Sequence, residues 1–139
     1  MLSIYASSGG VVEESNLRKF LDVIVKDKSK MAINKAGIVH ENGNIAAATS
    51  RFHMSQKDLK TIKTVLTNEG MDRLSYNGVT YCIKSRTSEQ LVAFNGSNYL
   101  IISKTDVTYV VVTCSSRQKH STVAAWINAI AQKIRERHL

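Results

Sequence analysis

The segment from Leu74 to Cys114 most constrains the fold, because it is rich in β-branched and aromatic residues and the whole chain contains no proline. Such residues favour the pleated, half-buried surface of a strand. Turn-forming pairs interrupt the segment at Asn77-Gly78, Asn95-Gly96 and Thr105-Asp106. Three turns between apolar runs predict about four antiparallel strands.

Two more strands are predicted before this segment. The sequence "INKAGIVHENGNIAAATS" holds two short apolar runs on either side of Asn42-Gly43. An Asn-Gly pair is a strong hairpin signal because both central residues of the favoured turn need positive φ. This region therefore predicts a strand, a turn and a second strand.

Three amphipathic helices accompany the strands. The first is predicted to begin with Ser15 as its N-cap and to end at "KDKSK", residues 26–30. The second begins with the capping-box pattern of Ser55 and Asp58 and is closed by Gly70. The third lies at the C-terminal end of the chain. The apolar stripes of the three helices follow helical spacing: Leu17, Phe20, Leu21 and Ile24; Leu59, Ile62 and Leu66; Val123, Ile127, Ile130 and Ile134.

The predicted order of elements is one helix, two strands, a helix, four strands and a final helix. Such an order is typical of an α+β fold with an antiparallel sheet and helices on its faces. A chain of 139 residues has the length of one domain. We expect a flexible lead at residues 1–12, which contain "ASSGG", and a single domain at residues 13–139.

The chain has 19 Lys and Arg residues but only 11 Asp and Glu residues, which gives a net charge of +8. This excess of positive charge favours an acidic partner. The partner classes are nucleic acid, anionic lipid and an acidic protein surface. Cations in "KDKSK" and "KIRERH" also complement the helix dipole where a helix ends. Phe94 and Tyr99 on neighbouring strands would form a stacking platform for bases, but the Lys and Arg residues do not cluster with them in the sequence. A signal peptide and a membrane-spanning run are not found in the sequence, which predicts a soluble, cytoplasmic protein.

The sequence lacks the patterns of common enzymes, and we expect no enzyme, metal or cofactor. Neither glycine-rich phosphate motif is found among its seven glycines, and its four histidines have no metal-binding spacing. Cys82 and Cys114 lie in apolar runs and are interpreted as buried thiols. A Cys-His nucleophile would most readily pair Cys114 with His120, yet both cysteines lie in strands, where no helix N-terminus would lower the thiol pKa. Trp126, at the edge of the last apolar stripe, is either a boundary residue of the core or a half-exposed interface anchor.

From about Ala32 onward the chain resembles the profilin family. "AGIVHENGNIAAATSRF" (36–52) is similar to the first hairpin of the family, and "SQKDLKTI" is similar to the short helix that follows it. "YNGVTYCI" retains Gly78 and Tyr81 of a family strand, and "YLIISKTDVTYVVVT" retains Lys104 and Thr105 of a strand pair. The resemblance implies a central antiparallel sheet of about six strands, with the N- and C-terminal helices on one face and a shorter helix on the other.

The resemblance also implies binding of actin monomers, control of polymerisation and a cytoskeletal location. The family holds actin with the last helix, the loop before it and the outer strands beside it. The positions that match are Thr80, Cys82, Lys84, Arg86, Arg117, Lys119, His120, Ala125, Trp126 and Ala129. Family members also bind phosphoinositides, for which Arg86, Lys133, Arg135 and Arg137 are the matching cations.

The chain departs from the family at the aromatic cleft that binds polyproline. Ala46 replaces the tryptophan of the second strand, Tyr5 is the one remaining N-terminal aromatic, and the chain ends in His138-Leu139. These changes predict poor polyproline binding and resemble the divergent profilins of Asgard archaea. The alternatives are a dimeric interaction module of the roadblock type, a basic nucleic-acid-binding domain and a small thiol enzyme or hydrolase. We expect a monomer if the profilin reading holds.

Overall fold

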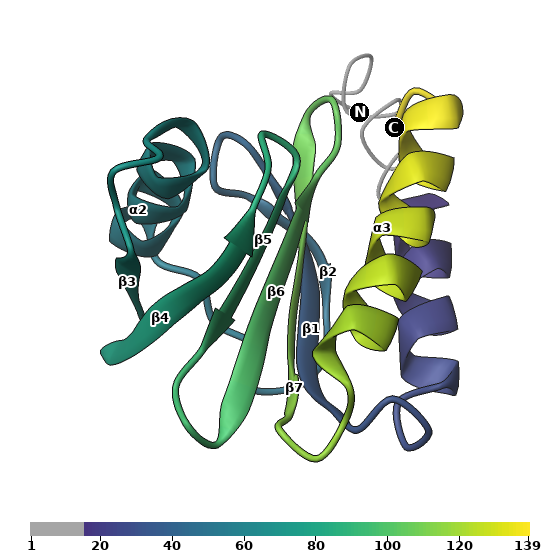
Figure 1. The fold of residues 1–139 in the computed structure, drawn as a ribbon. Coiled ribbons are helices and arrows are strands. Elements are labelled where there is room, and N and C mark those ends of the chain that lie inside the picture. The colour runs from purple at the N-terminus through teal and green to yellow at the C-terminus, as the bar shows by residue number, and fades with distance from the viewer. Residues whose placement is uncertain (1–15) are drawn as a thin grey trace.

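The computed structural model describes residues 16–139, which form one antiparallel sheet with helices on both faces (Figure 1). The strands lie in the order β2-β1-β7-β6-β5-β4-β3, and every neighbouring pair is antiparallel. Their bounds are β1 Ile33–His40, β2 Ile45–Ala48, β3 Arg73–Tyr76, β4 Val79–Arg86, β5 Gln90–Phe94, β6 Asn98–Lys104 and β7 Thr108–Ser115.

The sheet has seven strands, one more than the approximate count expected. The extra strand arises between Leu74 and Cys114, where a turn at Thr87 separates β4 from β5. The Thr87 hydroxyl accepts hydrogen bonds from the backbone amides of Glu89 and Gln90, at 3.1 and 3.0 Å. A threonine side chain thus closes this turn where glycine is absent, so the dipeptide signals used for the other turns do not reveal it.

The two terminal helices cover one face of the sheet. They are an N-terminal helix at residues 16–26 and α3 at His120–Glu136 (Figure 1). Their predicted apolar stripes are buried and pack with one side of β1, β2, β5, β6 and β7. The expected N-cap Ser15 and the expected lead at residues 1–12 lie outside the described residues.

The remaining helix, α2 at Gln56–Thr67, covers the opposite face. Ser55 caps it as predicted, since its hydroxyl accepts from the Asp58 amide and the Asp58 carboxylate accepts from the Ser55 amide. The helix ends at Thr67, and Asn68 rather than Gly70 occupies the C-cap. Leu59, Ile62 and Leu66 are buried against the sheet.

Asn-Gly turns connect strands as predicted. Asn77 and Gly78 have φ of 52° and 76° between β3 and β4, which is the left-handed backbone that such a hairpin requires. Gly43 lies between β1 and β2 with φ of 100°. Among residues 16–139, no helix combines the length and apolar character needed to cross a membrane.

The prediction of two buried cysteines is half wrong. Cys114 is fully buried under the terminal helices, whereas Cys82 is exposed. Cys82 lies on β4, one strand from the sheet edge, and α3 packs on β5 and β6. The apolar run around Cys82 therefore identifies a strand but not whether a helix covers it.

Candidate protein-interaction face

Three rings from three elements form a continuous row on the face that carries the terminal helices. Phe94 ends β5, Tyr99 lies in β6 and His120 begins α3. The Phe94 and Tyr99 rings stack with centroids 4.7 Å apart at 30°, and the Tyr99 and His120 rings lie 4.8 Å apart at 42°. We call Phe94, Tyr99 and His120 the aromatic row.

Strand register assembles the row. Phe94 pairs directly with Tyr99 across β5 and β6, so the two side chains leave the sheet on the same face. Phe94 also pairs with Cys82 of β4, which places the Cys82 thiol on that face. The sequence contained the ring types, but their alignment depends on pairings between strands that sequence spacing alone does not give.

Exposed residues of β4 extend the face beyond the row. Thr80 and Cys82 are exposed and alternate along the strand, so they point to the same side. Lys84 follows an irregularity in the register between Ile83 and Ser85, and its Nζ lies 5.4 Å from the centroid of the Phe94 ring. This distance allows a cation–π contact at the outer end of the row.

Arg86 is separated from this face. It pairs with Leu91, whose side chain belongs to the core under α2, and is therefore directed to the opposite side of the sheet. Its guanidinium donates to the carbonyl oxygens of Met71 and Glu69 at 2.6 and 2.5 Å. Arg86 thus fastens the loop after α2, and the structure does not bring it together with the other residues assigned to actin or phosphoinositide binding.

The start of α3 carries positive charge next to the row. Lys119 is the N-cap residue but makes no side-chain capping bond, and the first turn has no acidic residue. A capping side chain contributes about 1 kcal/mol, and cations near a helix N-terminus oppose its dipole. Arg117 and Lys119 are exposed at this end. Arg117 and Lys119 therefore make the surface before α3 positive, and the missing cap lowers the stability of the start of α3.

The α3 residues assigned to actin binding lie on different sides of the helix. Ala125 and Ala129 are exposed. Trp126 is half-buried and packs on the edge of the core. It shares a helical stripe with Ile130 and Lys133, at i, i+4 and i+7, and this stripe faces the N-terminal helix. Helical spacing therefore directs Trp126 toward the side of α3 that carries Ile130 and Lys133, at the edge of the core.

The cations assigned to phosphoinositides also divide into two groups. Lys133 and Arg137 line a cavity of about 290 Å³ between the terminal helices, together with Lys19, Phe20, Val23 and Ile130. The Arg137 guanidinium lies 5.5 Å from the Phe20 ring centroid. Arg135 lies on the other side of α3, where it contacts the Lys104 carbonyl, the Gln132 amide oxygen at 2.8 Å and Glu89 at 3.6 Å.

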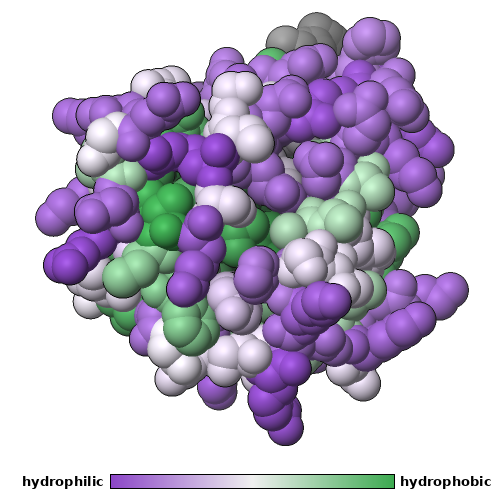
Figure 2. Space-filling view, viewed as in Figure 1, coloured by the Kyte–Doolittle hydropathy of each residue, from purple (hydrophilic) through white to green (hydrophobic). Residues whose placement is uncertain are grey.

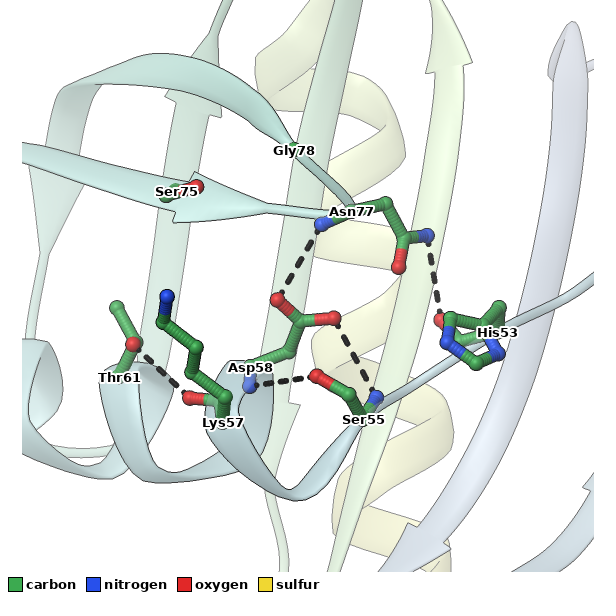
Figure 3. A pocket seen from close by; sticks show the side chains of 8 residues that line it. All are labelled: His53, Ser55, Lys57, Asp58, Thr61, Ser75, Asn77 and Gly78. Atoms are coloured by element: carbon green, nitrogen blue, oxygen red, sulfur yellow. Dashed lines mark hydrogen bonds between the residues drawn. The ribbon is translucent and has the colours of Figure 1, made fainter.

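A polar cavity of about 420 Å³ lies on the opposite face, between the start of α2 and the β3–β4 turn (Figure 3). Asp58 accepts from the Asn77 amide at 3.3 Å, and the Asn77 side chain donates to the His53 carbonyl at 3.3 Å. Every buried side-chain polar atom of residues 16–139 has a partner. Asp58 and Asn77 of the cavity wall therefore join the start of α2 and the segment before it to the β3–β4 turn.

Within residues 16–139, no group of three His, Cys, Asp or Glu side chains is placed to hold a metal ion.

The molecular surface shows hydrophobic patches between hydrophilic side chains on the side viewed in Figure 1 (Figure 2). From the sequence, Phe94 and Tyr99 are predicted only as a stacking platform for bases. Phe94 pairs with Cys82 and with Tyr99, and Tyr99 contacts His120, so both rings belong to the same face as the β4 residues.

Solved structures share this fold. Profilin IB of Acanthamoeba castellanii superposes with a TM-score of 0.71 at 18% identity, covering 81% of this chain and 92% of that chain. A Loki profilin, solved in complex with rabbit actin, gives 0.74 at 18% identity, with 88% and 96% covered. Profilin of Schizosaccharomyces pombe gives 0.70 at 16% identity, with 80% and 93% covered.

At the level of sequence, no curated protein matches the chain. The family model described as Profilin matches residues 15–139. This match covers all the described elements, from the N-terminal helix to the end of α3. The chain therefore belongs to the profilin family.

Proposed function

We propose that this protein binds actin monomers one to one and restrains their spontaneous polymerisation. The observation that carries the proposal is the aromatic row with Lys84 at its outer end, because it offers half-buried rings as an anchor beside an exposed cation. Membership of the profilin family supports it, as does the fold shared with a Loki profilin that was solved with rabbit actin.

The proposed actin-facing surface consists of the β4 side chains, the aromatic row and the cations before α3. Its members are Thr80, Cys82, Lys84, Phe94, Tyr99, His120, Arg117 and Lys119. In such a surface the central aromatic contacts set affinity, whereas exposed charges at the rim mainly speed association. Ala125 and Ala129 of α3 are secondary candidates because they are exposed. Trp126 is left out of this surface because it is half-buried against the core under the terminal helices.

The test is spontaneous nucleation of rabbit actin with the protein titrated in at physiological salt. We expect suppression that saturates near one protein per actin. His120→Ala should weaken binding by about 1–2 kcal/mol because it removes one end of the aromatic row. Lys84→Glu should slow association, and the matched control is Lys57→Glu, an exposed lysine on α2 at the opposite face. Equal binding by all three variants would contradict the assigned face.

We propose phosphoinositide headgroups as a second ligand, held by Lys133 and Arg137 with Lys19 in the cavity between the terminal helices. Three cations around an apolar floor of Phe20, Val23 and Ile130 favour this ligand. Arg86 and Arg135 are left out of the proposal because their guanidinium groups already contact protein oxygens. Lys133→Glu should reduce binding to vesicles containing phosphatidylinositol bisphosphate, compared with Lys60→Glu on α2. Equal vesicle binding would contradict this ligand.

Other proposed properties follow from a binding function. We expect a cytoplasmic, cytoskeleton-associated monomer that catalyses no reaction, and light scattering that gives twice the monomer mass would favour a dimeric module instead. A nucleic-acid function is less supported, because Phe94 and Tyr99 stack on each other and thereby cover ring faces that bases would need. Salt-sensitive binding to generic single-stranded RNA would reverse that judgement.

A further inference from the structure

Two loops that are far apart in the sequence lie together at one end of the molecule. The first, residues 27–32, follows the N-terminal helix, and the second, residues 115–119, precedes α3. The Gln118 side-chain amide donates to the Lys30 carbonyl at 2.5 Å across 88 positions of sequence. The Ser115 amide donates to the Ala32 carbonyl at 2.9 Å. Figure 1 shows both loops at the lower end of the terminal helices.

These bonds use the backbone of the first loop and leave its cations exposed. The Lys28 carbonyl accepts from the Ile33 amide at 2.9 Å, and the Lys30 carbonyl accepts from Gln118. The side chains of Lys28 and Lys30 are exposed. The loop is therefore fixed in position while its ammonium groups are presented to solvent.

Charge at this end is strongly one-sided. The two loops carry four cations, and Lys26 at the end of the N-terminal helix adds a fifth. With Asp27 as the single acidic residue among residues 26–32 and 115–119, the net charge of this end is +4, half of the net charge of the chain. We call these cations the cationic end: Lys26, Lys28, Lys30, Arg117 and Lys119. Neither of the two ion pairs found among residues 16–139 includes any of them. Together with the uncapped start of α3, they create a concentrated positive potential.

The cationic end is continuous with the aromatic row. The Ser116 amide donates to the Ser97 carbonyl at 3.0 Å, which joins the second loop to the turn that follows Phe94. Lys119 directly precedes His120, the last ring of the row. Ring contacts and hydrogen bonds therefore link Lys84, the three rings, the second loop and the first loop in an unbroken series.

We propose that the loop at residues 27–32 is part of the actin-binding surface, where Lys28 and Lys30 act with Arg117 and Lys119 on an acidic region of the actin monomer. This inference rests on the proposed function and adds to it a segment that the resemblance does not assign. Fixed loops beside an aromatic anchor suit a folded protein partner, and their charges should act mainly on the association rate. An anionic membrane is the competing partner.

The experiment measures association with rabbit actin monomers by stopped flow, at low and at high salt. The test variant is Lys28→Glu with Lys30→Glu. The control, Lys57→Glu with Lys60→Glu, changes the net charge equally on the exposed side of α2. We expect the test variant to associate about tenfold more slowly than the control at low salt, and the difference to shrink at high salt because the charges are exposed. Gln118→Ala should fall between the two because it releases the loop.

The outcomes separate this inference from the function on which it rests. If the parent protein does not bind actin, the proposed function fails and this inference fails with it. If the parent binds and both double variants associate equally, only the role of the loop is overturned. Equal actin binding with selective loss of binding to phosphatidylserine vesicles would assign the cationic end to a membrane and also overturn the inference. Circular dichroism confirms that each variant is folded.

Discussion

At the residue scale, Cys82 and Cys114 show how similar sequence contexts lead to different environments. Both thiols lie in strands on the side of the sheet that carries the terminal helices. Cys114 in β7 is covered, whereas Cys82 in β4 lies beyond the reach of α3. Alternation in a strand predicts which residues share a face, but only the strand order reveals which part of that face is covered.

This difference predicts selective thiol labelling. At pH 8, Ellman's reagent should react quickly with one thiol per native chain and with both thiols in denaturant. Burial raises the pKa of the Cys114 thiol from 9.0 to about 11, so this thiol is both inaccessible and protonated. Cys82→Ser should abolish the fast phase. Saturating actin should slow the labelling of Cys82 if that residue lies in the proposed surface, and unchanged labelling in the complex would argue against its placement there.

The long side chains were the hardest site residues to predict. Arg86 and Arg135 are predicted as free cations from the sequence, but each guanidinium group donates to a backbone carbonyl of a distant segment. Trp126 lies at the edge of an apolar stripe in the sequence, and only the packing of the terminal helices on the sheet shows that it is half-buried at the edge of the core. In contrast, Thr80, Cys82 and Lys84 lie on one strand next to the row. Short-range spacing therefore predicts shared faces well and distant partners poorly.

At the element scale, the capping box of α2 links helix stability to the neighbouring hairpin. The Asp58 carboxylate accepts from the Ser55 amide and from the Asn77 amide of the β3–β4 turn. Ser55→Ala should lower the free energy of unfolding by about 1 kcal/mol. Asp58→Ala should lower it by roughly 2 kcal/mol because it also leaves the Asn77 amide without its partner. Urea unfolding measures both, with Lys60→Ala as the exposed control in α2. Equal losses for Ser55→Ala and Asp58→Ala would contradict the role of Asp58 in holding the turn.

The groove between the terminal helices predicts that polyproline does not bind. Proline-rich ligands dock on exposed aromatic surfaces. Among residues 16–139, Phe20 is the one aromatic that lines this cavity, and Arg137 lies over its ring. Trp126 shares the lining stripe of α3 and is the single tryptophan, which makes it a natural reporter. Its fluorescence should not change when polyproline is added. A saturable change would show that residues outside the described range complete a cleft.

The turns show which elements could be predicted and which could not. Asn-Gly pairs identified the β1–β2 and β3–β4 hairpins because the turns require positive φ, which the structure shows at Gly43, Asn77 and Gly78. The turn between β4 and β5 depends on the Thr87 hydroxyl, a weaker and more common signal. Helix positions followed from apolar spacing, since every predicted stripe residue is buried. The sequence therefore predicted one strand too few because the turn after β4 carries no glycine signal, and not because the strand residues were misassigned.

At the scale of the whole molecule, the sequence predicted the layers but not the contacts between them. The α+β class and the distribution of helices over two faces follow from the order of elements and the implied resemblance. Strand β1 lies between β2 and β7, so the start of the domain pairs with its end. The loops at residues 27–32 and 115–119 meet as a consequence of that pairing. The cationic end could not be predicted because its two halves appear unrelated in the sequence.

Burial of titratable side chains between the sheet and its helices predicts how the free energy of unfolding depends on pH. Burial raises the pKa of the Cys114 thiol to about 11 and also raises the pKa values of Tyr76, Tyr81 and Tyr109. The charges of Asp58 and Tyr81 add to the shift of Tyr76, and the charge of Glu41 adds to that of Tyr109. In the unfolded chain these groups lose their protons at lower pH than in the native state. Their contribution to the free energy of unfolding should therefore be fully present below about pH 9 and should fall as the pH rises toward 11.

Urea midpoints measured from pH 7.5 to 10.5 would test this dependence. Cys114 alone should account for a loss of about 2 kcal/mol, because each unit of pKa shift corresponds to roughly 1.4 kcal/mol. Cys114→Ala should have lower stability at neutral pH because it leaves a cavity, but its stability should decline less steeply with pH. Cys82→Ser should keep the slope of the parent, since that position is exposed. A parent midpoint that stays constant up to pH 10.5 would mean that the native sheet opens enough to ionise these groups without unfolding, which contradicts the tight core under the terminal helices.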